Sequence, residues 1–137
     1  MPQNLYLEQL VITRFFDPRK QDRYRGFVAS AKNRRKLLAD LHSGHFFRAD
    51  ALDRVTGIEE DVIQQALRQH GIQSSSCYLI SDKAALDTHT LPLPEALQQV
   101  VGWGSATILV FGEAELIFVE LEGLRNRFIS KPRALAR

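Results

Sequence analysis

The sequence contains a single cysteine, Cys77, among its 137 residues. An internal disulfide therefore cannot form, and the common structural zinc sites, which use two to four cysteines, are excluded. Nothing in the cysteine content indicates an oxidising compartment.

Long apolar runs are missing as well. No segment approaches the roughly 20 consecutive apolar residues that a membrane-spanning helix needs. The first residues, MPQNLYLEQL, carry neither the basic region nor the small-residue cleavage site of a secretory signal. We therefore expect a cytoplasmic protein that does not interact with membranes.

The composition is that of a folded protein. With 45% hydrophobic and 25% charged residues, the chain lies well away from disordered or fibrous compositions. Its length falls within the usual size of one domain. We predict a single α+β domain over residues 1–130. Residues 131–137 contain Pro132 and three basic residues but no apolar period, and we expect them to form a flexible basic tail.

Charge is distributed unevenly, although the net charge is only +2. Residues 13–48 contain ten Lys or Arg against three acidic residues, whereas residues 49–123 contain three against twelve. Residues 124–137 add five more basic residues and no acidic one. The basic parts can attract an anionic partner, or they can pack against the acidic middle of the same chain. The second alternative is the ordinary one for a folded domain.

The segment 105–121, SATILVFGEAELIFVEL, predicts the centre of the fold. Its first apolar run, 106–111, is rich in β-branched and aromatic residues and is separated by a Gly-containing turn from a second run at 116–119. This pattern is typical of a β-hairpin. Because the first run is apolar at every position, both of its faces should be covered. The second run is flanked by Glu115 and Glu120, which we expect to approach solvent, so it should lie nearer the rim.

Helices are predicted mainly before this hairpin. The first segment suits a helix capped near Asn4, although Val11-Ile12-Thr13 also fits a strand. A helix continued through Arg34 and Arg35 would place two guanidinium groups on its apolar side, so we expect a break at residues 30–33. The predicted helices are residues 5–16, a helix from Asp17-Pro18 to that break, a third ending before Gly44, a short helix at 49–55, a helix from a capping box at 56–59 to His70, and residues 94–101.

Strands dominate the second half, at residues 77–80, in the hairpin and around residues 127–129. The linker-like stretch 73–76 separates a helical part, 1–72, from a strand-rich part, 77–130. If the strands at 77–80 and 106–111 are parallel neighbours, their connection should be right-handed. The fold class is α+β, with a helical N-terminal half packed on a small, mainly antiparallel sheet of three to four strands.

Groups that could support catalysis or hold a metal are weak candidates. Cys77 could be combined with His89 and a carboxylate, Asp82 or Asp87, but a lone cysteine at the start of a strand is typically a small buried hydrophobe. His42 and His45 are one helical turn apart, yet no third ligand of matching spacing stands nearby. We predict no catalytic residue, no cofactor and no metal, and we favour a non-enzymatic role.

The basic segment is the strongest surface feature of the sequence. Its aromatic neighbours, such as Tyr24 and Phe27, occupy positions that the helical pattern predicts to be buried, which weakens a role in stacking on nucleic-acid bases. We predict that its basic residues contact a partner: Arg19, Lys20, Arg23, Arg25, Lys32, Arg34, Arg35 and Lys36.

Our leading hypothesis is a protein-binding or regulatory module whose partner is another protein or a second copy of the chain. Trp103, Arg127 and Ile129 are candidate interface residues, because aromatic residues are enriched at interfaces and an open strand edge at 127–130 could pair with another strand. The alternative is a nucleic-acid-binding protein that uses the segment 19–36 and the C-terminal tail.

Overall fold

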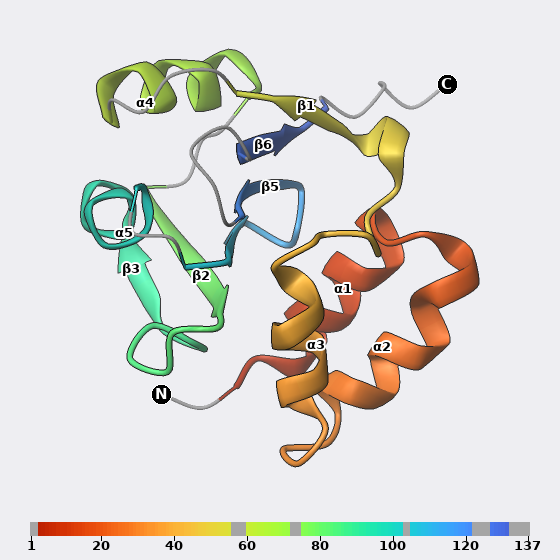
Figure 1. The fold of residues 1–137 in the computed structure, drawn as a ribbon. Coiled ribbons are helices and arrows are strands. Elements are labelled where there is room, and N and C mark those ends of the chain that lie inside the picture. The colour runs from red at the N-terminus through yellow and green to blue at the C-terminus, as the bar shows by residue number, and fades with distance from the viewer. Residues whose placement is uncertain (1–2, 56–59, 72–74, 103–104, 122–126, 132–137) are drawn as a thin grey trace.

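A six-stranded sheet lies at the centre of the computed structural model, which describes residues 3–55, 60–71, 75–102, 105–121 and 127–131 (Figure 1). Its strand order is β1-β6-β5-β4-β2-β3, and all of its pairings are antiparallel. The strands are β1 (Leu52–Arg54), β2 (Ser76–Ser81), β3 (Thr90–Pro92), β4 (Thr107–Phe111), β5 (Leu116–Glu120) and β6 (Arg127–Ser130). The α+β class is confirmed, with more strands than the three to four expected.

Strand β4 is enclosed on both faces, as its uninterrupted apolar sequence predicts. All five of its residues are buried. Ile108 and Val110 belong to one hydrophobic cluster, whereas Leu109 and Phe111 belong to the cluster on the opposite face. Because successive side chains of a strand point to opposite faces, a strand in this position needs apolar or hydrogen-bonded side chains on both faces.

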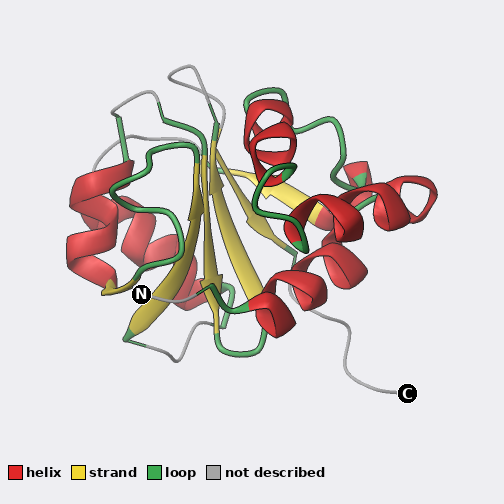
Figure 2. Cartoon of the chain, turned by 90° about the horizontal axis from the view of Figure 1, so that it is seen from below, coloured by secondary structure: helices red, strands yellow, loops and turns green. Residues whose placement is uncertain are grey.

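One face of the sheet packs against α1 (Leu5–Phe15), α2 (Gln21–Val28) and α3 (Arg34–Leu41). The other face packs against α4 (Glu60–Gln69) and α5 (Leu93–Val100). Figure 2 shows helices on both sides of the sheet. The helical N-terminal part thus covers one face alone and shares the other with α5.

Local signals place most of the helix ends correctly. The side chain of Asn4 accepts a hydrogen bond from the Leu7 amide at the start of α1, and Asp17 caps a 3₁₀ turn, Pro18–Lys20, that leads into α2. The predicted break separates α2 from α3. Beyond α3, Gly44 has φ +67°, and a Cβ added there would lie 2.8 Å from Leu121 Cδ1. Only glycine therefore fits this position without strain.

Several predictions of local structure are wrong. Residues 49–55 form a 3₁₀ turn, Ala49–Ala51, followed by the edge strand β1 instead of a helix. Strand β3 was missed, because three residues are too few to show a period. Strands β2 and β4 are neighbours but pair antiparallel, so the rule for a right-handed parallel connection does not apply to them. Strand β5 is fully buried between β4 and β6 instead of lying near the rim. The capping box at 56–59, residues 73–74 and Trp103 lie outside the described residues.

A row of buried polar side chains crosses one end of the sheet. Ser81 pairs with Thr107, Thr107 with Glu120, and Glu120 with Arg127 in register. The Ser81 and Thr107 hydroxyls are 2.8 Å apart, and Arg127 donates to both carboxylate oxygens of Glu120 at 2.6 Å. Glu120 also accepts a hydrogen bond from the Gly102 amide at 3.1 Å. The expectation that Glu120 approaches solvent is wrong, because this ion pair allows its burial.

The Glu120–Arg127 pair predicts a large effect of removing one partner. Glu120→Gln removes the buried carboxylate that accepts from Arg127 Nε and Nη2 and should lower the free energy of unfolding by about 3 kcal/mol. Urea denaturation monitored by circular dichroism measures this change. The exposed Glu113→Gln variant is the matched control and should leave the midpoint unchanged. A Glu120→Gln midpoint equal to that of the control would contradict the proposed energetic role of the pair.

Candidate basic groove between α2 and α3

The predicted basic residues divide into three groups in the structure. Arg34 is directed into the protein. Arg19 and Arg25 are engaged by neighbouring side chains. The others lie on the surface of α2, α3 and the turns beside them: Lys20, Arg23, Lys32, Arg35 and Lys36.

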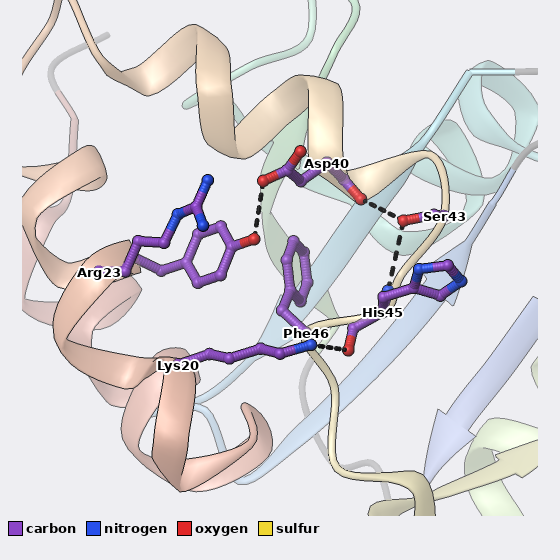
Figure 3. Close-up of a pocket in the computed structure, with 7 residues that line it drawn as sticks. Lys20, Arg23, Asp40, Ser43, His45 and Phe46 are labelled. Atoms are coloured by element: carbon purple, nitrogen blue, oxygen red, sulfur yellow. Dashed lines mark hydrogen bonds between the residues drawn. The ribbon is translucent and has the colours of Figure 1, made fainter.

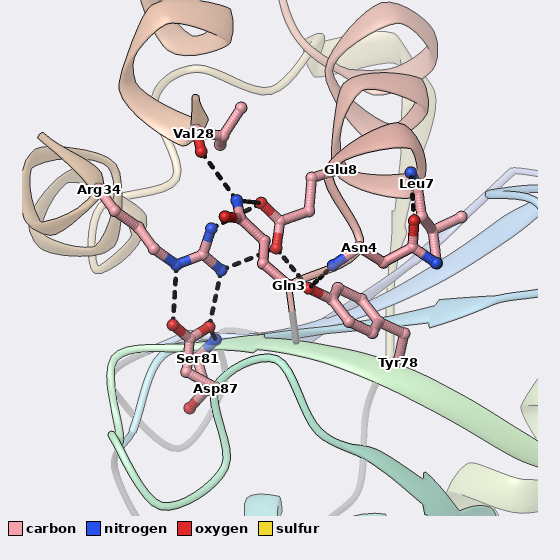
Figure 4. A network of polar contacts seen from close by, with 9 residues as sticks. All are labelled: Gln3, Asn4, Leu7, Glu8, Val28, Arg34, Tyr78, Ser81 and Asp87. Atoms are coloured by element: carbon pink, nitrogen blue, oxygen red, sulfur yellow. Dashed lines mark hydrogen bonds and ion pairs between the residues drawn. The ribbon is translucent and has the colours of Figure 1, made fainter. Parts of the chain in front are cut away.

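Arg34 forms the centre of a polar network (Figure 4). Its guanidinium donates to both oxygens of Glu8, at 2.6 and 2.9 Å, and to both oxygens of Asp87, at 2.8 Å each. The Tyr78 hydroxyl donates to Glu8 at 2.6 Å, and the Ser81 amide donates to Asp87 at 3.0 Å. Two carboxylates facing one cation therefore receive further donors, which compensates the excess negative charge.

The burial of this network determines its role. The side chain of Glu8 is fully inaccessible, and that of Arg34 is 11% exposed. Burial alone would lower the pKa of Arg34, but the hydrogen bonds to Asp87 and Glu8 outweigh it and raise that pKa. Burial and the bond to Glu8 also raise the pKa of Tyr78. The placement of Arg34 on a solvent-exposed contact surface is wrong, because its side chain connects α3 to α1 and to the β2–β3 connection.

Arg19 and Arg25 are largely neutralised by their neighbours. Arg19 donates through Nε and Nη2 to Asp17, and these bonds lower the pKa of Asp17 to about 2. Arg25 donates to the Thr13 hydroxyl at 2.7 Å, towards α1, and lies 3.4 Å from Asp22. Both side chains are therefore less available to an anionic partner than the sequence suggests.

The remaining surface includes a groove of about 290 Å³ between α2, α3 and the turn that follows α3 (Figure 3). Lys20, Arg23 and Tyr24 line its α2 side together, because residues three and four apart in a helix share one face. Lys20, at the start of α2, closes one end by donating to the His45 carbonyl at 3.0 Å. The described residues that line the groove are Lys20, Arg23, Tyr24, Asp40, Ser43, His45 and Phe46.

Aromatic rings support the basic side chains of this region. The Arg23 guanidinium carbon lies 5.3 Å from the centre of the Phe27 ring and 5.8 Å from that of Tyr24. Lys36 Nζ lies 5.6 Å from the centre of the Phe27 ring. The cation–π contacts hold Arg23 and Lys36 over the same Phe27 ring, while both residues stay exposed to solvent. Below them, the Phe46 ring stacks on Phe16 at 4.1 Å.

Asp40 brings one negative charge to the groove. The Tyr24 hydroxyl donates to its carboxylate at 2.7 Å, and the Ser43 hydroxyl donates to its main-chain carbonyl at 3.1 Å. Burial and the bond to Asp40 raise the pKa of Tyr24 to about 12. The groove therefore combines cations at its rim with an acceptor on its wall, which suits a ligand that presents both an acidic group and a hydrogen-bond donor.

Cys77 lacks the properties of a catalytic nucleophile. It is 2% exposed, and burial raises the pKa of its thiol to about 12. Asp87 is paired with Arg34, and Asp82 Oδ2 lies 2.5 Å from His42 Nε2. The prediction that Cys77 is a small buried hydrophobe is confirmed. Within the described residues, no cluster of three or more His, Cys, Asp or Glu side chains could hold a metal ion.

The prediction of an open strand edge at residues 127–130 is wrong. Strand β6 lies between β1 and β5, so it is not an edge. Arg127 is 1% exposed and Ile129 is fully buried. Trp103 and most of the basic tail fall in the parts of the chain that the structure does not describe. Asp40 and His45 could not be recognised from the sequence as neighbours of Lys20 and Arg23, because their proximity depends on how α2 packs against α3.

Comparison with known proteins gives no identification. The sequence matches no protein-family model and no curated protein, and the fold matches no solved structure. In the parts of the chain that the structure describes, none of the helices has the length and apolar character needed to cross a bilayer.

The raised pKa of Tyr24 predicts a loss of stability in alkali. An unfolded tyrosine ionises near pH 10, whereas Tyr24 in the folded protein retains its proton to about pH 12. The stability that this proton retention contributes is complete below pH 10 and is lost as the pH rises through about 12. Urea midpoints measured across this range should fall less steeply for Tyr24→Phe than for the wild type. If the urea midpoints of the two proteins fell in parallel with pH, the raised pKa of Tyr24 would be contradicted.

Proposed function

We propose that this chain is a non-enzymatic binding module that recognises an acidic segment of a partner protein through the α2–α3 groove. The proposal is supported chiefly by the convergence of Lys20, Arg23 and His45 around one concave site, with Lys36 beside it. We further infer that the module works in the cytoplasm, in agreement with the expectation from its sequence.

The shape of the site favours a side-chain carboxylate as its ligand. Arg23 makes cation–π contacts with two rings, so less of its side-chain entropy is left to lose when it forms bonds to an anion. A planar guanidinium can bind a carboxylate through two parallel hydrogen bonds. Asp40 and the Lys20–His45 contact give the site polar groups on two further sides. A peptide with acidic residues and free main-chain amides presents matching acceptors and donors.

A nucleic-acid backbone is a poorer match to the same surface. Binding along a phosphate chain depends on a continuous series of free cations. Here Arg34 is buried in ion pairs, Arg19 is paired with Asp17, and Asp40 contributes a negative charge to the groove. We therefore keep nucleic-acid binding through segment 19–36 and the C-terminal tail as the alternative that the experiment must distinguish.

Charge reversal at the groove provides the test. Fluorescence anisotropy can measure binding of a labelled peptide of alternating Glu and Ser residues, and of the same peptide with Gln in place of Glu. Arg23→Glu and Lys36→Glu should each weaken binding of the Glu peptide about tenfold, because each replaces an attraction with a repulsion at the rim. The Gln peptide should bind weakly to every variant.

Arg35→Glu is the matched control. It changes the net charge by the same amount, on an exposed residue of α3 that does not line the groove. If it weakens binding as much as Arg23→Glu, the attraction is general and the groove is not the site. If a labelled single-stranded oligonucleotide binds more tightly than the peptide, with an affinity that falls linearly in log–log form as salt rises, the nucleic-acid alternative replaces the proposal.

A further inference from the structure

The described sheet ends in two edge strands with different properties. At one edge, β3 contains Pro92, which has no amide hydrogen, and it leads directly into α5. At the other edge, β1 consists of Leu52, Asp53 and Arg54 and contains no proline. Proline commonly protects an edge from pairing with a further strand. Strand β1 lacks this protection.

The backbone of β1 is oriented for pairing on its outer side. Val55 donates to the Arg127 carbonyl at 2.9 Å, and the Ala51 carbonyl accepts from Lys131 at 2.8 Å. In an antiparallel pair, residues alternate between those that bond to the neighbouring strand and those whose polar groups point away from it. Since residues 51 and 55 bond to β6 and its extension, the amide and carbonyl of Leu52 point outwards.

A hollow lies beside β1 on each face of the sheet. On the face covered by α1–α3, Leu52 and Phe128 line a mainly apolar hollow of about 330 Å³ together with Leu121. On the opposite face, Asp53 and Val55 line one of about 320 Å³ together with residues of α4. A strand added to an edge directs alternate side chains to the two faces, so both hollows would receive side chains.

The side chains of β1 define the charge that a partner strand needs. The Asp53 carboxylate is 45% exposed and lies 3.3 Å from His70 Nε2. Arg54 is on the other face, with its guanidinium carbon 5.0 Å from the centre of the Phe128 ring. Directly opposed residues of opposite charge stabilise a strand pair, and like charges destabilise it. The matching residues are therefore basic opposite Asp53, acidic opposite Arg54 and apolar opposite Leu52.

We propose that the outer edge of β1 binds an extended peptide of a partner protein as an additional antiparallel strand, with consecutive acidic, basic and apolar residues facing Arg54, Asp53 and Leu52. This site is separate from the α2–α3 groove and does not depend on the function proposed for it. Main-chain hydrogen bonds supply the attraction, and the alternation of charge with the two hollows sets the sequence preference.

A second copy of the chain is a poorer occupant of this edge. Antiparallel pairing of two β1 strands, with Leu52 opposite Arg54, places Asp53 of one copy directly opposite Asp53 of the other. Two carboxylates at this spacing repel each other. The edge is thus protected against self-pairing by its central charge while remaining suited to a complementary partner.

The test uses two labelled peptides with the same composition. One contains the core Glu-Arg-Leu and the other Arg-Glu-Leu, each flanked by Thr and Val. The Glu-Arg-Leu peptide should bind the wild-type protein roughly tenfold more tightly in fluorescence anisotropy, because two attractive cross-strand pairs become repulsive in the other peptide. Asp53→Lys should weaken the preference severalfold, and Asp50→Lys, an exposed control in the preceding turn, should leave it unchanged.

A third peptide separates strand pairing from contacts of side chains alone. This peptide contains the Glu-Arg-Leu core with a methyl group on the backbone nitrogen of its Leu residue. The methyl group removes the donor that faces Leu52, and binding should fall to the level of the Arg-Glu-Leu peptide. Equal binding of the two unmethylated peptides, or undiminished binding of the methylated one, would overturn the proposal. Sedimentation showing a dimer that the Glu-Arg-Leu peptide dissociates would assign the edge to a second copy, and would also overturn it.

Discussion

Strand β4 has no face that can be left in water, and this constraint organises the rest of the protein. Its neighbours β5 and β2 must extend the sheet on either side, and helices must cover both surfaces. Burial of a Val, Leu, Ile or Phe side chain stabilises the fold by about 1.5 to 3 kcal/mol. The consecutive apolar residues of β4 therefore make a double covering strongly favourable. The N-terminal helices provide one covering layer, and α4 and α5 provide the other.

Two arginines inside this layered structure are paired with carboxylates. Arg34 lies between two carboxylates, and Arg127 lies against Glu120. Removing cations from the surface in this way changes what the surface can bind. The basic character of segment 19–36 is reduced to a few exposed side chains, of which Lys20, Arg23 and Lys36 lie at or beside one groove. The internal ion pairs thus determine which basic side chains remain available at the proposed binding site.

The sequence was sufficient for those features that depend on nearby residues. Asn4, the Asp17-Pro18 pair and Gly44 identified helix ends, and the apolar run of β4 identified the centre of the sheet. The break between α2 and α3 followed from the cost of burying guanidinium groups. The same reasoning failed to place Arg34, because its partners Glu8 and Asp87 are 26 and 53 residues away in the sequence. An unpaired charge and a paired one look identical until the fold is known.

The edge strands and the groove could not be predicted for a related reason. Strand β1 has only three residues, and its pairing with β6 joins residues 52–54 to residues 128–130, far apart in the sequence. Glu120 looked like a solvent-facing residue because its partner Arg127 belongs to the next strand. Likewise, Asp40 and His45 meet Lys20 and Arg23 only when α2 packs on α3. Packing between separate helices and strands, and not local preference, decides each of these positions.

The network around Arg34 limits how this sequence can change over evolutionary time. A lysine cannot replace the arginine, because a single ammonium group cannot present two parallel pairs of donors to two carboxylates. Loss of Glu8 or Asp87 alone would leave the other members with mismatched charge in a poorly hydrated site. Drift at these three positions is therefore expected to be coupled, and descendants of this chain should either keep the whole set or replace it together with apolar residues.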